Sequence, residues 1–76
     1  MIELASVRRA TGLTQTQVAD ALGVGQAAVS KIERQNDLLL STLSAYLTAL
    51  GVDAKLVVTV AGETVEHNLT AGRRHR

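Results

Sequence analysis

Amide, hydroxyl and cationic side chains gather in the middle of this chain, between residues 15 and 34. The set comprises Gln15, Gln17, Gln26, Ser30, Lys31 and Arg34. A glutamine can form two hydrogen bonds with the major-groove edge of adenine, and Lys and Arg side chains neutralise phosphates. The chemistry open to this set is therefore the recognition of base edges and of a phosphate backbone.

Catalytic and metal-binding patterns are missing from the sequence. The chain has no cysteine, and its two histidines, His67 and His75, lie far apart near the C-terminus. No Ser, His and acid fall into a plausible triad, no glycine-rich phosphate loop is present, and no two carboxylates share a predicted pocket. We therefore expect no metal, no cofactor and no enzymatic activity. The formal net charge of +1 is too small to indicate a partner.

Residues 14–34 must position these side chains. Their pattern predicts two short amphipathic helices, at 15–22 and 26–34, which are separated by a turn that contains Gly23 and Gly25. The apolar positions that recur at helical spacing are Val18, Ala19, Leu22, Val29 and Ile32. Val24 lies within the turn, which predicts that it is buried between the two helices. This pattern is typical of a helix-turn-helix, whose second helix is presented to the major groove of DNA.

The flanking segments predict two more helices. Residues 2–11 are expected to form the first, which ends at Gly12, and Thr14 is expected to cap the helix that follows. One or two of the leucines at 38–40 should pack under the bundle. Ser41 or Thr42 should cap a fourth helix that ends at Gly51, with Leu43, Leu47 and Leu50 buried and Tyr46 half-buried at its edge.

The hydrophobic period then changes to that of strands. Residues 54–60 and 64–69 predict a β-hairpin with its turn at 61–63. A lone hairpin is marginally stable in water, so we expect it to pair with that of a second chain. The expected dimerisation residues are Leu56, Val58, Val60, Val65 and Leu69. The strand register stays open, because both faces contain apolar residues.

One mainly α domain results, with three parts: a DNA-binding unit at 1–51, a hairpin at 52–70 and a basic disordered tail at 71–76. No apolar run approaches the about 18 residues that a membrane span needs, and the N-terminus lacks the pattern of a signal peptide. A cytoplasmic location without membrane contact is expected.

The stretch from Leu13 to Arg34 resembles the Cro/cI-type (XRE) helix-turn-helix family. It contains L-T-Q, then A-x-x-L-G-V and then V-S-x-I-E at the family's spacing. The continuation S-T-L-x-x-Y-L-x-A-L-G, followed by a hairpin, is similar to HigA-like antitoxins of toxin–antitoxin operons. The resemblance implies a lambda-repressor-like fold, a homodimer on a palindromic operator, autorepression of the operon and a small ribonuclease toxin as partner.

The resemblance also implies roles for individual residues. Gln15 would reach a phosphate and brace Gln26, and Arg8 would pair with Glu33. The residues that would face the groove are Gln26, Ala27, Ala28, Ser30 and Lys31, with Arg34 near the DNA backbone. The start of the second helix faces the backbone in this geometry, which adds Gln17 to the candidates. Thr42, at the start of the fourth helix, could bind a phosphate through free amides or serve only as a cap.

Two features depart from the family pattern. Gly25 replaces the usual hydroxyl cap, and Ala27 and Ala28 can at most touch a thymine methyl group. Two alternatives to an antitoxin therefore stay open: a stand-alone transcriptional regulator without a toxin, and a protein-binding module that has lost its DNA contacts.

Overall fold

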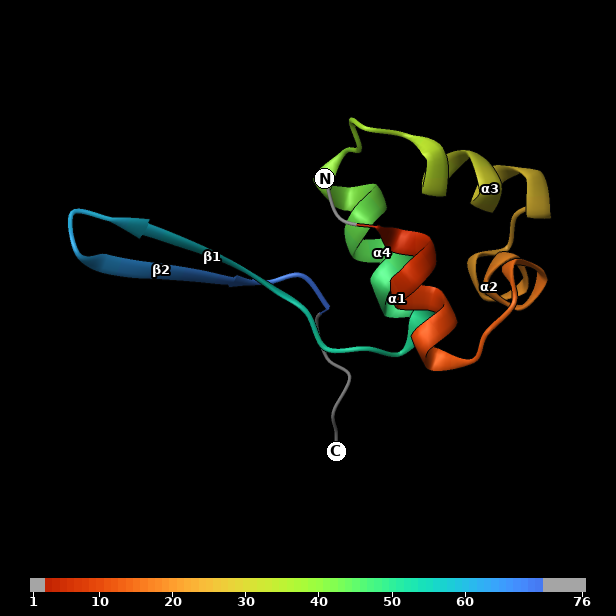
Figure 1. Ribbon diagram of the computed structural model, residues 1–76, viewed down its shortest axis with the longest axis horizontal. Helices are drawn as coiled ribbons and strands as arrows, with labels where there is room; N and C mark the ends of the chain where they lie inside the picture. The colour runs from red at the N-terminus through yellow and green to blue at the C-terminus, as the bar shows by residue number, and fades with distance from the viewer. Residues whose placement is uncertain (1–2, 71–76) are drawn as a thin grey trace.

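Four helices precede an antiparallel hairpin in the computed structural model, which describes residues 3–70. The elements in chain order are α1 (Leu4–Thr11), α2 (Gln15–Leu22), α3 (Gln26–Arg34), α4 (Leu40–Leu50), β1 (Lys55–Val60) and β2 (Glu63–Asn68). The helices gather at one end of the molecule, and the hairpin extends from them as an arm on the side away from α2 and α3 (Figure 1). The predicted fold class is confirmed. Within the described residues, no helix is long and apolar enough to cross a membrane.

The expected cap of α2 is present and is more complete than predicted. The Thr14 hydroxyl accepts a hydrogen bond from the backbone N–H of Gln17 at 3.1 Å. The Gln17 side-chain oxygen accepts one from the backbone N–H of Thr14 at 2.9 Å. These reciprocal bonds form a capping box, which satisfies two amides that the helix start would otherwise leave free.

The start of α4 differs from the prediction. Leu39 occupies the N-cap without a side-chain hydrogen bond, so neither Ser41 nor Thr42 is the cap. Leu38 packs against the core, whereas Leu39 is 73% exposed and Leu40 is 48% exposed. The prediction from capping propensity was wrong: Leu39, which has an extended backbone, takes the N-cap position directly after Leu38, which is partly buried against the core.

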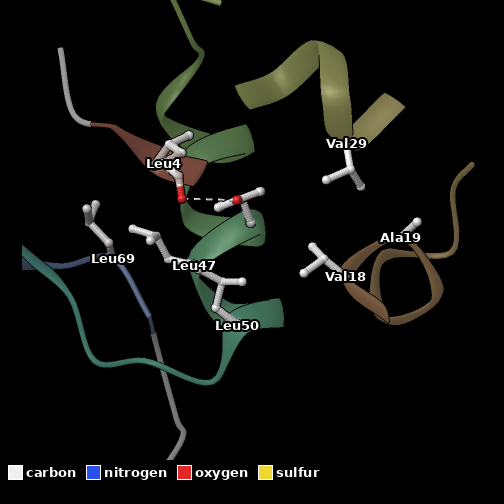
Figure 2. Close-up of a cluster of buried hydrophobic side chains, with 8 residues drawn as sticks. Leu4, Val18, Ala19, Val29, Leu47, Leu50 and Leu69 are labelled. Atoms are coloured by element: carbon white, nitrogen blue, oxygen red, sulfur yellow. Dashed lines mark hydrogen bonds between the residues drawn. The ribbon is translucent and has the colours of Figure 1, made fainter. Parts of the chain in front are cut away.

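A single apolar core joins the four helices. Its fully buried members include Val18 from α2 and Val29 from α3 (Figure 2). Tyr46 from α4 is also fully buried. Tyr46 was expected at the edge of the core, but it has no exposed surface. Its hydroxyl donates a hydrogen bond to the backbone oxygen of Leu4 at 3.3 Å, which lets the phenol enter an otherwise apolar core.

The hairpin turn consists of Ala61 and Gly62, both with positive φ, at 50° and 84°. Such a two-residue turn matches the right-handed twist of the strands and sets their register. Val58 pairs with Val65, and Val57 pairs with Glu66. Since side chains alternate along a strand, one face of the hairpin carries all four of the following apolar residues: Leu56, Val58, Val60 and Val65. We call these residues the apolar hairpin face.

The base of the hairpin is fixed to α4. The Ser44 hydroxyl donates a hydrogen bond to the backbone oxygen of Leu69, and the backbone N–H of Leu69 donates to Ala54 O at 2.9 Å. Leu69 is 8% exposed and belongs to the helical core, beyond the end of β2 (Figure 2). Its assignment to a dimer face was therefore wrong, because Leu69 already has its contacts within its own chain. Ile2 and the predicted tail at 71–76 lie outside the described residues.

Candidate nucleic-acid interface

The outer surface of α3 carries most of the predicted DNA-binding residues. Gln26, Ala27, Ala28, Lys31 and Arg34 are all exposed, and Ser30 is half-buried. Val29 lies on the opposite side of the helix and is fully buried. In Figure 1, α3 lies at the edge of the bundle, with no element covering its outer side among the described residues. This helix can therefore enter a groove of DNA without rearrangement of the core.

The turn between α2 and α3 is held by backbone bonds. Val24 was predicted to be buried in this turn, but it is 44% exposed. The backbone N–H of Val24 donates to Ala19 O at 3.0 Å, and Gly23 has a left-handed φ of 74°. These are the features of a glycine-terminated helix end. Backbone hydrogen bonding thus fixes the turn, and Val24 does not need to fill a gap between the helices.

Gly25 caps α3 without offering a side-chain hydrogen bond, and its φ of −81° suits any L-residue. An added Cβ would meet no heavy atom within 4 Å. We expect Gly25→Ser to raise the free energy of unfolding by about 0.5–1 kcal/mol, because serine supplies a cap and restricts the unfolded chain. Gly23→Ser, at a left-handed φ, should instead lower it by about 1 kcal/mol. Urea unfolding of the two variants measures both signs; a stabilised Gly23→Ser would contradict this account of the turn.

A buried ion pair joins α1 to α3, as predicted. Arg8 Nε donates to Glu33 Oε2 at 2.7 Å, and Arg8 Nη2 donates to Glu33 Oε1 at 3.3 Å. The exposed fractions of the two side chains are 11% and 4%. The Tyr46 hydroxyl also donates to Glu33 Oε2, at 2.5 Å. Because Arg8 additionally donates to the backbone oxygen of Leu13 at 3.0 Å, the pair connects three helices and the α1–α2 loop.

The charges of this cluster stabilise each other. Burial raises the pKa of Glu33, but the hydrogen bonds from Arg8, Tyr46 and Gln15 outweigh it and hold that pKa below its ordinary value. The hydrogen bond to Glu33 raises the pKa of Arg8. Burial, and then the hydrogen bond to the carboxylate, raises the pKa of Tyr46. At neutral pH Glu33 is therefore ionised, and Tyr46 keeps the proton that it donates.

Gln15 links this cluster to the exposed helix. Its Nε2 donates to Glu33 Oε1 at 2.9 Å, and its Oε1 accepts a hydrogen bond from Gln26 Nε2. The contact between Gln15 and Gln26, which the family resemblance implied, is present. The contact between Gln15 and Glu33 was missed at the level of sequence. The signal for it was the cost of a buried carboxylate, which already required polar partners for Glu33.

Three other candidate DNA-binding residues, Gln17, Thr42 and Arg34, differ in their surroundings. The side-chain oxygen of Gln17 is engaged in the capping box, which leaves its NH₂ group free for other partners. Thr42 is the third residue of α4 and is half-buried. Arg34 ends α3 and is exposed. Contacts of these residues with phosphate stay predictions.

A short helix, a glycine-ended turn and an exposed second helix that is braced from behind define a helix-turn-helix protein. A helix-turn-helix family model matches residues 4–57, and the chain belongs to that family. Over 67 residues it is 45% identical to a protein of Mycobacterium tuberculosis named "Putative antitoxin HigA3". That match covers 83% of this chain and 61% of the relative, so the chain spans about three fifths of the relative's length.

Two solved structures are similar over most of their length. One, titled "DNA bound antitoxin HigA3", superposes with a TM-score of 0.80 at 40% identity, covering 99% of this chain and 97% of the other. The second, titled "Induced DNA bending by unique dimerization of HigA antitoxin", has a TM-score of 0.74 at 42% identity, covering 88% and 90%. The resemblance to HigA-like antitoxins is confirmed.

Proposed function

We propose that this protein is a DNA-binding repressor that acts as the antitoxin of a toxin–antitoxin operon and binds its own promoter. The observation that carries the proposal is the exposed face of α3, a helix that the buried Val29 and the Arg8–Glu33 pair attach to the bundle. The HigA proteins to which the chain is similar include one whose title describes it as DNA-bound, which supports the same role. The proposed activity is binding rather than catalysis, and it would take place in the cytoplasm.

In this proposal α3 lies in the major groove of the operator. Gln26 and Lys31 supply the hydrogen bonds to base edges, with Ser30 beside them and Ala27 and Ala28 against thymine methyl groups. The proposed phosphate contacts come from Arg34 and from polar residues near the starts of α2 and α4. These polar residues are Gln15, Gln17 and Thr42. With two alanines in the groove, direct contacts are few, and DNA shape would contribute to specificity.

A second copy of the chain would complete the binding unit. The apolar hairpin face is 43–61% exposed in a single chain, which is a costly arrangement in water. We propose that two copies bury this face against each other around a two-fold axis. The two α3 helices would then read half-sites of a palindrome about 34 Å apart.

A small ribonuclease toxin is the proposed protein partner, by similarity to proteins named as antitoxins. The second candidate is a stand-alone regulator with the same DNA contacts. Co-purification with the product of the adjacent reading frame distinguishes the two. A protein-binding module without DNA contacts is a third candidate, favoured by the two alanines on α3.

Removal of Gln26 or Lys31 tests the DNA contacts. We expect Gln26→Ala to weaken operator binding by about tenfold to a hundredfold, because a bidentate base contact discriminates by about 1–3 kcal/mol. Lys31→Ala should weaken it and, if Lys31 contacts a phosphate, reduce the steepness of the salt dependence by about one unit. Fluorescence anisotropy with promoter DNA at several salt concentrations measures both effects.

Lys55→Ala is the matched control for Lys31→Ala. It removes the same charge from an exposed side chain on the hairpin, away from α3. If Lys55→Ala weakens binding as much as Lys31→Ala does, the protein binds DNA through charge alone and the groove assignment is wrong. If the unaltered protein binds no promoter DNA, the protein-binding module is the better account.

A further inference from the structure

We propose that Glu33 is a positioning residue that sets which base Gln26 recognises, through Gln15. The inference rests on the proposed DNA-binding function and extends it from the exposed helix into the buried ion pair. The chain of contacts is continuous: Glu33 Oε1 accepts from Gln15 Nε2 at 2.9 Å, and Gln15 Oε1 accepts from Gln26 Nε2.

The first step concerns the orientation of the Gln15 amide. An ionised carboxylate accepts hydrogen bonds and donates none, so the group that faces Glu33 must be a donor. The low pKa of Glu33 keeps its carboxylate ionised. Gln15 therefore has to direct its NH₂ group toward Glu33. Because the amide is planar, its oxygen is left for Gln26.

The second step transfers this orientation to the exposed helix. The Gln15 oxygen can only accept, so the Gln26 amide directs one N–H toward it. The groups of Gln26 that stay available to DNA are its carbonyl oxygen and its second N–H. One acceptor and one donor match the N6 amino group and N7 of adenine, whereas the O6 and N7 of guanine offer two acceptors. Because the buried carboxylate can only accept hydrogen bonds, it favours adenine over guanine as the base that Gln26 contacts.

Glu33 acts here in addition to its role in stability. Its Oε2 accepts hydrogen bonds from Arg8 Nε and Tyr46, and its Oε1 accepts from Gln15 Nε2 at 2.9 Å and from Arg8 Nη2 at 3.3 Å. Loss of the Gln15 contact should release the Gln26 amide to rotate. In the rotated state Gln26 presents both of its N–H groups and can bond to guanine.

A measurement without DNA tests the chain of contacts. In ¹⁵N-labelled protein, the hydrogen-bonded side-chain N–H of Gln15 and that of Gln26 should exchange with solvent at least about tenfold more slowly than the side-chain N–H groups of the exposed Gln35. In Gln15→Met, which keeps the length of the side chain but neither hydrogen bond, the Gln26 signals should exchange as fast as those of Gln35. Fast exchange at Gln26 in the unaltered protein would overturn the proposal, whether or not the protein binds DNA.

Selection of binding sites from a random DNA library tests the consequence for specificity. The unaltered protein should select adenine at one position in each half-site, about tenfold or more over guanine. Gln15→Met should accept both purines there within about twofold. Glu33→Gln should do the same if it folds; if it does not, Gln15→Met alone decides, because every contact from Glu33 to Gln26 passes through Gln15.

Tyr46→Phe is the control for a purely structural effect. It removes a hydrogen bond to Oε2 and leaves Oε1 and Gln15 in place, so its base preference should equal that of the unaltered protein. An unchanged preference in Gln15→Met, with only the affinity lowered, would overturn the proposal. Failure of the unaltered protein to select any DNA would refute the proposed function instead, while the exchange measurement would still report on the contacts.

Discussion

Replacement of Glu33 by glutamine is expected to lower the free energy of unfolding by about 3 kcal/mol, since it leaves Arg8 charged and buried without its counter-ion. The side chains of Arg8 and Glu33 are only 11% and 4% exposed, so water cannot stabilise the Arg8 charge once its partner is lost. A domain of this size has a total stability of roughly 4–11 kcal/mol, and the loss is a large share of it. Urea unfolding followed by circular dichroism measures the change.

The Lys55–Glu66 pair is a matched control within the same chain. Its atoms lie 3.1 Å apart, but the two side chains are 53% and 52% exposed. Glu66→Gln should therefore cost less than about 1 kcal/mol. Equal losses in Glu33→Gln and Glu66→Gln would show that burial does not govern the strength of the Arg8–Glu33 pair.

The same pair predicts a pH dependence of the unaltered protein. The pKa of Glu33 is lower in the folded state than its ordinary value of about 4.3. The stabilisation is therefore complete above that ordinary value and is lost as the pH falls through the folded pKa. The difference in unfolding free energy between the protein and Glu33→Gln should shrink below about pH 4. A difference that stays constant down to pH 2 would contradict the ionised state of Glu33.

Aspartate in place of Val58 is expected to separate the proposed dimer. Val58 lies in the apolar hairpin face, is 44% exposed in one chain and pairs with Val65. Each copy loses an apolar contact of about 1.5 kcal/mol. Because a two-fold interface contains the substituted residue in both copies, the loss occurs twice. The dissociation constant should rise by at least about a hundredfold, before the cost of burying the charges is added. Light scattering coupled to size-exclusion chromatography measures the mass.

Thr59→Asp is the control for this variant. Thr59 is the next residue of β1, is also exposed and points to the opposite face. It should leave the dimer intact and lower strand propensity by a similar amount. A dimeric Val58→Asp, or a monomeric Thr59→Asp, would place the interface away from the apolar hairpin face. Circular dichroism should show intact helices in both variants, because Val58 and Thr59 are not part of the helical core.

Local rules account for most of what the sequence predicted correctly. Thr14 caps the start of α2 and Gly23 caps its end. The spacing of the apolar residues around Val18 and Val29 identifies the buried sides of α2 and α3. Each of these features depends on neighbours within one or two helical turns. For that reason single residues and their spacing were sufficient to predict the helix-turn-helix.

Only the tertiary structure decided the features that depend on distant residues. Leu69 lies in the helical core instead of the hairpin face because Ser44, 25 residues earlier, binds its backbone oxygen. Tyr46 is fully buried because its hydroxyl donates hydrogen bonds to the backbone oxygen of Leu4 and to the Glu33 carboxylate.

The amides and cations of residues 15–34 were visible in the sequence, and so was their suitability for DNA. Their orientation was not, because the direction of the Gln26 amide depends on Gln15 and on the buried Glu33 carboxylate. A sequence states which hydrogen-bonding groups exist, whereas only the fold determines which of them are already engaged and which face outward.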